Sequence, residues 1–313
     1  SRAVQELSRT LSISKYRAFI KVAESGSLTK AAKQLGYSQP GISHMVDSLE
    51  TEMGFPLLIR NKDKIVPTEN GKKVLYYCYQ IIKNETYLQE TVSAINGLLE
   101  GTISMGAYNS LMVGFLPHAV RNFSNVYPNI ELHLREVACG EFHELLPRGE
   151  LDLGFMVDSI PKGFSFIPLL RDSACVIMRR DHPFAPYEAI SPTLLNGCNF
   201  IMPVPGYDDV VNTVLQKSPF FPKIKYYTAS DVAAISMVAN DLGISVISSL
   251  QVGLLPDDVI SRPFQGAYGR SLGIAIKSLR HAPPVIKEFV RICKETAAQL
   301  QQAPLPEPPH DTR

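Results

Sequence analysis

The sequence has no long apolar run. No stretch approaches the roughly 20 consecutive apolar residues that cross a bilayer, and the N-terminus lacks a signal-like hydrophobic segment. The five cysteines, at positions 78, 139, 175, 198 and 293, include no C-x-x-C pair, which argues against a disulfide framework or a zinc site. We therefore expect a soluble protein of the cytoplasm with free thiols and no association with a membrane.

Motifs typical of enzymes are also missing. There is no Gly-rich phosphate loop, no H-E-x-x-H and no G-x-S-x-G, and the seven histidines are dispersed. An enzyme would need an activated nucleophile or a metal cluster, so the sequence predicts a protein that is not an enzyme, has no metal site and needs no cofactor.

Charge is distributed unevenly over the 313 residues. The net charge is +1, but residues 1–100 contain 13 Lys and Arg against 10 Asp and Glu, a net of +3, and the remainder has a net of −2. Solvated helices often show such an excess, so the charge permits DNA binding without establishing it. With 45% hydrophobic residues, the chain can fill the cores of two or three domains.

Two short helical patterns meet at Gly36, which permits a tight turn. Ser38 is placed to cap the second pattern, and polar Gln39, Ser43 and His44 lie on its outer face. This arrangement predicts a helix-turn-helix, although an ordinary αα-hairpin has the same spacing. The apolar positions recur on one face of each helix: Leu28, Ala31, Ala32 and Leu35, then Ile42, Met45, Val46 and Leu49.

Elements on both sides complete this unit. Apolar spacing over 13–23 predicts a helix on which the pair packs. Residues 57–60 and 65–67 read as a small hairpin with a charged tip, a wing beside the second helix. Arg60, Lys62 and Lys64 of this hairpin could reach phosphates, although a solvated lysine-rich turn is an equal alternative.

A long helix is predicted from Glu69, with Thr68 as its cap. Heptad positions 74, 78, 81, 85, 88, 92, 95 and 99 are apolar at seven of eight places. Such a seam favours pairing with a second copy of the chain. A two-fold dimer presents two recognition helices to half-sites about 34 Å apart, or a multiple of that distance.

Many of these positions, at these intervals, resemble the N-terminal signature of the LysR-type transcriptional regulators. Leu58 departs from it, since the family usually has Phe there. The resemblance implies double-stranded operator DNA as a partner and a homodimer or homotetramer, and it allows contact with RNA polymerase. The positions are Phe19, Val22, Ala23, Gly26, Ser27, Leu28, Ala31, Ala32, Leu35, Ser38, Gln39, Pro40, Ser43, Leu49, Glu50, Gly54, Leu57, Arg60, Thr68 and Gly71.

The candidate DNA-binding residues have different expected roles. Gln39 can bond adenine at two atoms, Ser43 can donate or accept with little selectivity, and His44 can meet a guanine acceptor or a phosphate. Pro40 stiffens the first helical turn. The others are expected to hold the DNA backbone: Ser27, Thr29, Lys33, Ser38, Arg60, Lys62 and Lys64.

From residue 101 onward, strand and helix patterns alternate, which predicts a parallel sheet covered on both faces and two α/β lobes. Helices are predicted over 111–125, 141–147, 231–239 and 284–300. Strands are predicted over 101–106, 130–134, 151–155, 174–178, 200–202, 225–227, 243–247 and 272–276.

This region resembles the LysR effector domain, which is similar in fold to periplasmic solute-binding proteins. The likeness rests on segments 149–152, 181–185 and 238–243. The implied domains are a winged helix-turn-helix over 1–68, a linker dimerisation helix over 69–100 and an effector-binding domain over 101–303. Lobe I takes about 101–160 and 268–303, lobe II takes about 161–267, and proline-rich 304–313 reads as a disordered tail.

Ligands of such domains sit at the carboxyl ends of strands, where helix N-termini present N–H groups. Ser, Asn and Asp at these places are often only helix caps. The loops contain no obvious arginine that would clamp a carboxylate, which argues against the usual expectation of a small organic acid, and the sequence does not name the small-molecule effector. The candidate effector-binding residues are Tyr108, Asn109, Ser110, Cys139, Pro203, Val204, Gly206, Tyr207, Ser230, Asp231, Ser245 and Ile247.

Two other functions stay open. Cys139 and His143 are four residues apart, as in a thiol- or metal-responsive site on one helical turn, although an accidental pairing is favoured. Segment 204–217 lacks the cysteines that redox-sensing members of the family use there. A solute-binding protein without DNA function would leave the first hundred residues unexplained. The sequence therefore predicts a transcriptional regulator modulated by a small molecule bound between two lobes.

Overall fold

The computed structural model describes residues 12–302 except 62–63, 97–99, 205 and 207–209. Its contacts divide the chain into two compact units, Ser1–Gly97 with Pro147–Gly149 and Leu98–Leu146 with Glu150–Arg313. Lys62, Tyr207 and the predicted tail lie outside the described residues. Within the described ranges, no helix combines the length and the apolar character that a membrane span requires.

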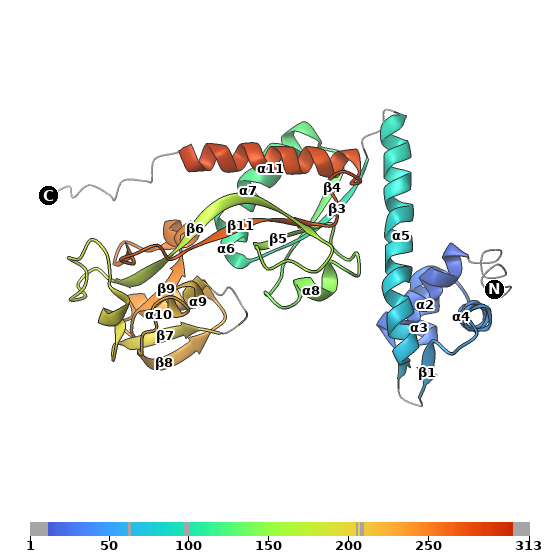
Figure 1. The fold of residues 1–313 in the computed structure, drawn as a ribbon, viewed down its shortest axis with the longest axis horizontal. Helices are drawn as coiled ribbons and strands as arrows, with labels where there is room; N and C mark the ends of the chain where they lie inside the picture. Colours follow the sequence, from blue (N-terminus) through green and yellow to red (C-terminus); the bar gives the residue numbers. More distant parts are fainter. Residues whose placement is uncertain (1–11, 62–63, 97–99, 205, 207–209, 303–313) are drawn as a thin grey trace. The chain divides into compact units, whose positions relative to one another are not determined.

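The first unit begins with the predicted helix-turn-helix (Figure 1). Its helices are α2 (Ile13–Ser25), α3 (Leu28–Leu35) and α4 (Gln39–Met53). Their apolar faces meet in a core in which Phe19, Ala31 and Leu49 are fully buried. A left-handed glycine ends α3 at Gly36, where φ is 70°, and this backbone conformation is strained for residues with a Cβ.

The wing is a two-stranded antiparallel hairpin of β1 (Leu58–Arg60) and β2 (Ile65–Pro67). Glu50 of α4 accepts hydrogen bonds from the amides of Leu57 and Leu58 at 2.6 and 2.9 Å. The amide of Ile65 donates to the carbonyl of Gly26 at 2.9 Å. Both strands are therefore tied to the helices that they flank.

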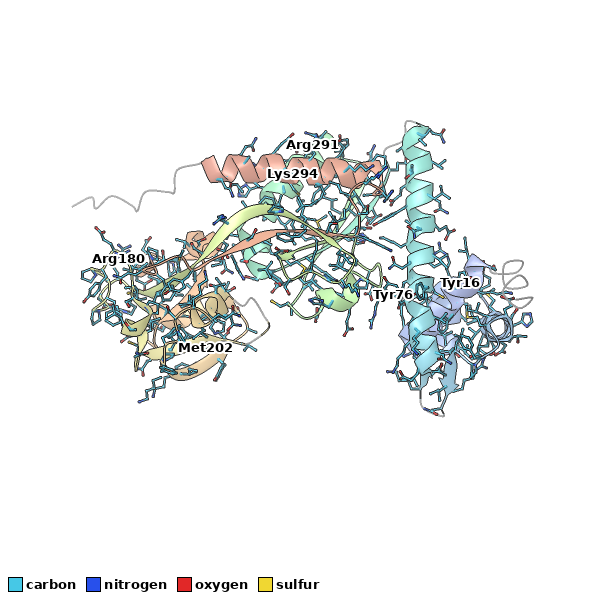
Figure 2. The ribbon with its side chains drawn as sticks, viewed as in Figure 1. Tyr16, Tyr76, Arg180, Met202, Arg291 and Lys294 are labelled. Atoms are coloured by element: carbon cyan, nitrogen blue, oxygen red, sulfur yellow. The ribbon has the colours of Figure 1, made fainter. Side chains whose placement is uncertain are left out.

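Helix α5 (Glu69–Ile95) is capped as predicted, because Thr68 Oγ1 accepts from the Gly71 amide at 2.8 Å. Cys78 is buried in the core of the first unit. The later apolar seam positions are exposed: Ile81 by 40%, Leu88 by 63%, Val92 by 48% and Ile95 by 79%. Figure 2 shows side chains such as Tyr76, itself 41% exposed, projecting from this helix.

Lobe I of the second unit contains three parallel strands, β3 (Gly101–Ala107), β4 (Ile130–Glu136) and β5 (Leu153–Val157). Phe123 and Phe289 meet edge to face at 4.9 Å, which packs α7 (Leu116–Val126) against α11 (Pro284–Gln302). Short α8 (Phe142–Leu145) places Phe142 against Gly154, where a Cβ would lie 2.9 Å from its ring.

The helix predicted over 111–125 is in fact two helices. α6 (Asn109–Gly114) ends at Phe115, whose φ of −136° is not helical, and α7 follows. Pro117 lies in the first turn of α7 and lacks the amide hydrogen that would continue one uninterrupted helix.

The sheet that was predicted to be parallel is so only in part, because β3, β4 and β5 are parallel and the strands beside them are not. Strand β11 (Gly269–Ile276) runs antiparallel to both β5 and the long β6 (Ser165–Arg179). Strands β9 (Ser245–Ser248) and β10 (Val259–Pro263) are also antiparallel to β6. Alternating helix and strand patterns do not reveal strand direction, and here β6 and β11 pass in opposite directions through both lobes (Figure 1).

Lobe II is covered on both faces. Helix α9 (Val210–Leu215) lies on one face and helix α10 (Asp231–Ala239) on the other. Strand β7 (Asn199–Pro203) runs parallel to β8 (Lys223–Thr228). Val176 of β6 packs in the same core as Val214 of α9, whereas its neighbour Ile177 packs in the core of Ile235 on α10. Helical turns η1 (Pro192–Leu195) and η2 (Ser249–Leu254) complete the lobe.

Candidate functional site

The outer face of α3 and α4 contains the predicted DNA-binding residues. Ser27 and Ser38 act as helix caps, their hydroxyls accepting from the amides of Lys30 and Gly41 at 3.3 and 3.2 Å. Of the other predicted DNA-binding residues on these two helices, Ser43 is half-buried and the rest are exposed: Thr29, Lys33, Gln39, Pro40 and His44. The two capping serines and the exposed side chains therefore all belong to the first unit.

The wing adds two cations. Lys64 is exposed, and its stem lies over Gly26, where a Cβ would stand 2.9 Å from Lys64 Cγ. Arg60 bends back onto α4, where its Nη1 lies 3.3 Å from Ser43 Oγ and its Nη2 pairs with Asp47. Asp47 was not among the residues predicted from the sequence, because an acid among candidate DNA-binding residues has no obvious role.

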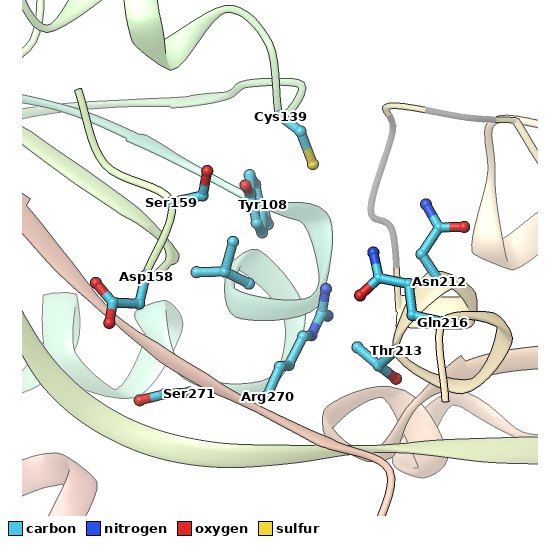
Figure 3. Close-up of a pocket in the computed structure, with 10 residues that line it drawn as sticks. Tyr108, Cys139, Asp158, Ser159, Asn212, Thr213, Gln216, Arg270 and Ser271 are labelled. Carbon is cyan, nitrogen blue, oxygen red and sulfur yellow. The ribbon is translucent and has the colours of Figure 1, made fainter. Parts of the chain in front are cut away.

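A cavity of about 490 Å³ opens in the second unit, within the size range of small-molecule sites. Its described lining comes from both lobes: Tyr108, Cys139, Val157, Asp158, Ser159, Asn212, Thr213, Gln216, Arg270 and Ser271. Figure 3 shows the side chains of Cys139 and Arg270 entering it from different elements. Most of this lining can donate or accept hydrogen bonds.

Arg270 is the cation that the loop sequences did not reveal. It enters from β11, two residues before the apolar run at Leu272. Its Nε donates to Asp172 at 2.8 Å and its Nη2 to Ser110 at 3.2 Å. Ser110, a predicted effector residue, is fully buried as a partner of this guanidinium and is not part of the described cavity lining.

A buried glutamine joins the two lobes beside the cavity. Gln251 Nε2 donates to Asn109 Oδ1 of α6 at 2.8 Å and to Asp231 Oδ2 of α10 at 2.6 Å. The Cys139 amide also donates to the carbonyl of Gly206 at 3.0 Å. Asn109 and Gly206 thus take part in contacts between the lobes, and Asp231 holds Gln251 from within lobe II.

The remaining predicted effector residues lie elsewhere. Ser230 caps α10, accepting from the Ala233 amide at 3.2 Å, and Pro203 and Val204 are at the end of β7 and just beyond it. The prediction that Ser245 and Ile247 lie on the rim of the effector site is wrong, because both are fully buried in lobe II. Ser245 donates to the carbonyl of Ile201 at 2.8 Å, so its hydroxyl serves the sheet and not a rim.

The cysteines differ in their surroundings. Burial raises the pKa of Cys78 to about 12 and that of Cys175 to about 11, and it also raises the pKa values of Cys198 and Cys293. Cys139 is half-buried at the cavity. Within the described ranges, which include Cys139 and His143, no group of three or more His, Cys, Asp and Glu side chains is placed to hold a metal ion.

Comparison with known proteins agrees with this geometry. The model described as "Bacterial regulatory helix-turn-helix protein, lysR family" matches residues 13–72. The model described as "LysR substrate binding domain" matches residues 96–298, more than half of the chain. The uncharacterised HTH-type transcriptional regulator YvbU of Bacillus subtilis is 29% identical over 290 residues, 91% of this chain and 98% of YvbU.

Solved structures share the fold. A full-length cysteine-to-aspartate variant of OxyR from Pseudomonas aeruginosa has a TM-score of 0.76 at 23% identity, covering 92% of this chain and 95% of that one. Full-length CbnR complexed with its target DNA has a TM-score of 0.62 at 20% identity, covering 91% and 100%. Together with the family matches, they show that this chain belongs to the LysR family of DNA-binding transcriptional regulators, with an effector-binding domain following its helix-turn-helix.

Proposed function

We propose that the chain reads operator DNA with α4 and responds to a small molecule held in the cavity of the second unit. The observation that supports DNA reading most directly is the exposed polar row on α4, in a helix capped and oriented by its own unit. CbnR, which shares the fold, was solved with its target DNA. The expected sites are those predicted above: Ser27, Thr29, Lys33, Ser38, Gln39, Pro40, Ser43, His44, Arg60, Lys62 and Lys64.

A selection experiment tests DNA reading. The purified chain is used to enrich duplexes from a randomised library, and binding to a selected and a scrambled duplex is then measured by fluorescence anisotropy. Gln39→Ala should weaken binding to the selected duplex far more than to the scrambled one, because base contacts specify and phosphate contacts position. Gln34→Ala, an exposed glutamine on α3, is the matched control. Equal losses on both duplexes would show that Gln39 reads no base.

The exposed seam of α5 supports assembly as a homodimer or a homotetramer. Water-exposed Leu88 and Ile95 favour burial against a second copy. A dimer presents two α4 helices to one operator, and the assembly also offers surfaces for RNA polymerase. In this role the protein acts by binding and not by catalysis. We place it in the cytoplasm, where the DNA is.

The cavity is the proposed effector site. Tyr108 and Cys139 of the predicted set line it, and we add Asn212, Gln216 and Arg270. The proposed domains remain 1–68, 69–100 and 101–303. A ligand that alters the contacts through Gln251 would change how the lobes close, and α5 would pass that change to the spacing of two DNA-reading units.

A thermal-shift screen of small metabolites against the whole chain tests the cavity, because a ligand bound only by the native state raises its melting temperature. Gln216→Trp fills part of the cavity and should abolish the shift given by a hit. Lys217→Trp changes the next residue, which is not among the described lining, and should keep it. A hit that shifts both variants equally binds elsewhere.

A further inference from the structure

Asp47 lies on the exposed face of α4 that we propose to face DNA. It is one helical turn beyond Ser43 and two turns beyond Gln39, so the three side chains lie on one side of the helix. The Asp47 side chain is 51% exposed and that of its partner Arg60 is 39% exposed. A carboxylate at this place repels the phosphates of DNA unless a neighbouring cation neutralises its charge.

Ser43, Asp47 and Arg60 form a closed triangle. The Ser43 hydroxyl donates to Asp47 Oδ2 at 3.3 Å. Arg60 Nη1 donates to Ser43 Oγ at 3.3 Å, and Arg60 Nη2 pairs with Asp47 Oδ1. The wing is thereby joined to the middle of the recognition helix through two side chains of α4.

This triangle contributes little to folding, because ion pairs between exposed side chains have a small net effect on stability. Its wing is already held by main-chain bonds from Glu50 and Gly26. The consequence of the triangle therefore concerns the chemistry of the surface that it forms.

The hydroxyl of serine has one hydrogen to donate and two lone pairs that accept. In the triangle, the hydrogen of Ser43 is engaged by Asp47 and one lone pair by Arg60. One lone pair remains for a partner outside the protein. A free serine can meet either a donor or an acceptor on a base, whereas this one can only accept.

We propose that Asp47 is a positioning residue for DNA recognition that, with Arg60, makes Ser43 an obligate acceptor. In the major groove the donors are the exocyclic amines, N6 of adenine and N4 of cytosine, whereas guanine and thymine present acceptors. Ser43 then selects adenine or cytosine on the strand it contacts. This inference rests on the proposed reading of DNA by α4.

The test applies the library selection to the wild-type chain and to S43A, D47A, D47N and D47E. The base pair contacted by Ser43 is the one whose preference disappears in S43A. In the wild type, one base pair in one orientation should be preferred there by about threefold to tenfold, the discrimination of one net hydrogen bond, and binding should fall when the adenine N6 or cytosine N4 amine of that pair is replaced by hydrogen. D47A should reduce this preference to within about twofold, because the hydroxyl can then donate as well, and leave the other positions unchanged. D47E, which still offers a carboxylate to Arg60, should retain it.

Controls separate this role from folding and from net charge. D47N keeps the shape of the side chain if D47A melts early. Its amide can donate to Ser43 as well as accept from it, so its preference should lie between those of D47A and D47E. E69Q removes an acid from another exposed ion pair, Glu69 with Lys72, and should leave the motif unchanged. A D47A motif identical to that of the wild type, whether binding is tighter or weaker, overturns the inference, and so does unchanged wild-type binding to a duplex whose adenine N6 or cytosine N4 amine at the Ser43 base pair is replaced by hydrogen. If the wild type enriches no motif, the proposed function itself fails.

Discussion

The Nε atom of Arg270 lies 2.8 Å from Oδ2 of Asp172, and the two side chains are only 7% and 0% exposed. Oδ1 of Asp172 accepts from the Ser248 hydroxyl at 2.7 Å and from the Ser249 hydroxyl at 2.9 Å. The pair thus joins the crossing strands β6 and β11 to the start of η2, and Arg270 also lines the cavity.

Replacing Asp172 by Ala should destabilise the second unit strongly. The change leaves Arg270 buried without its carboxylate, and breaking a buried pair costs about 3–5 kcal/mol. Calorimetric melting of the whole chain measures the loss. The matched control is Asp181→Ala, which removes the acid of the exposed Arg179 pair and should leave the midpoint unchanged. Equal effects of the two variants would show that the Asp172 network does not support the fold.

At Gly71 the backbone of another segment leaves no room for a side chain. A Cβ at this position would lie 2.1 Å from the carbonyl oxygen of Leu57, so Gly71→Ala must displace α5 from the wing. We expect a loss of about 1–3 kcal/mol, as for overpacking, measured by calorimetry. Gly41→Ala is the comparison, since its Cβ meets only Ser38 Oγ at 3.1 Å and alanine favours helix. A Gly71→Ala protein that melts like the wild type would refute the close approach.

Local signals explain where sequence and structure agree. Helix α10 runs over Asp231–Ala239, as predicted, because Ser230 caps its start and the apolar pattern ends with it. The Thr68 cap of α5 is equally local. The first half of β6 was missed, because polar Arg171 and Asp172 interrupt its apolar pattern, and only the partner strand explains why they are there.

The site was less predictable because its contacts join distant segments. Arg270 reaches the cavity only because β11 pairs with β6, and its partner Asp172 is 98 residues away. The three-residue link of Asp47 with Ser43 and Arg60 likewise depends on how the wing folds back. Ser245 and Ile247 show the converse, since their place after a helix pattern suggested a rim whereas the sheet buries both.

Cys139 should react first with iodoacetamide near neutral pH. Thiolates are the reacting species, and burial raises the pKa values of the other four cysteines, which lowers their thiolate fraction: Cys78, Cys175, Cys198 and Cys293. Peptide mass spectrometry after timed alkylation gives the order of reaction. A compound that shifts the melting temperature should slow labelling of Cys139. Labelling that such a compound leaves unchanged would place the compound outside this cavity.

Stability should fall at alkaline pH, in part through Cys78. Burial raises its pKa from 9.0 to about 12 in the folded chain, so the folded state retains a proton that the unfolded state loses. The resulting stabilisation is complete below pH 9 and is lost as the pH rises from 9 to 12. Calorimetry at pH 8 and pH 10.5 should show a larger decrease for the wild type than for Cys78→Ala. Parallel decreases would mean that Cys78 does not titrate with folding.

Leu88→Glu should separate the copies of the chain. Leu88 is 63% exposed on the α5 seam, one turn from Val92, and a carboxylate there would have to be buried unpaired in a self-pairing coiled coil. Sedimentation of the wild type should give a dimer or tetramer, and Leu88→Glu should give a smaller species. Gln89→Glu introduces the same charge at the adjacent exposed position and should leave the assembly intact. A Leu88→Glu chain that sediments like the wild type would mean that the copies pair through another surface, and the exposed seam of α5 would then need a different partner.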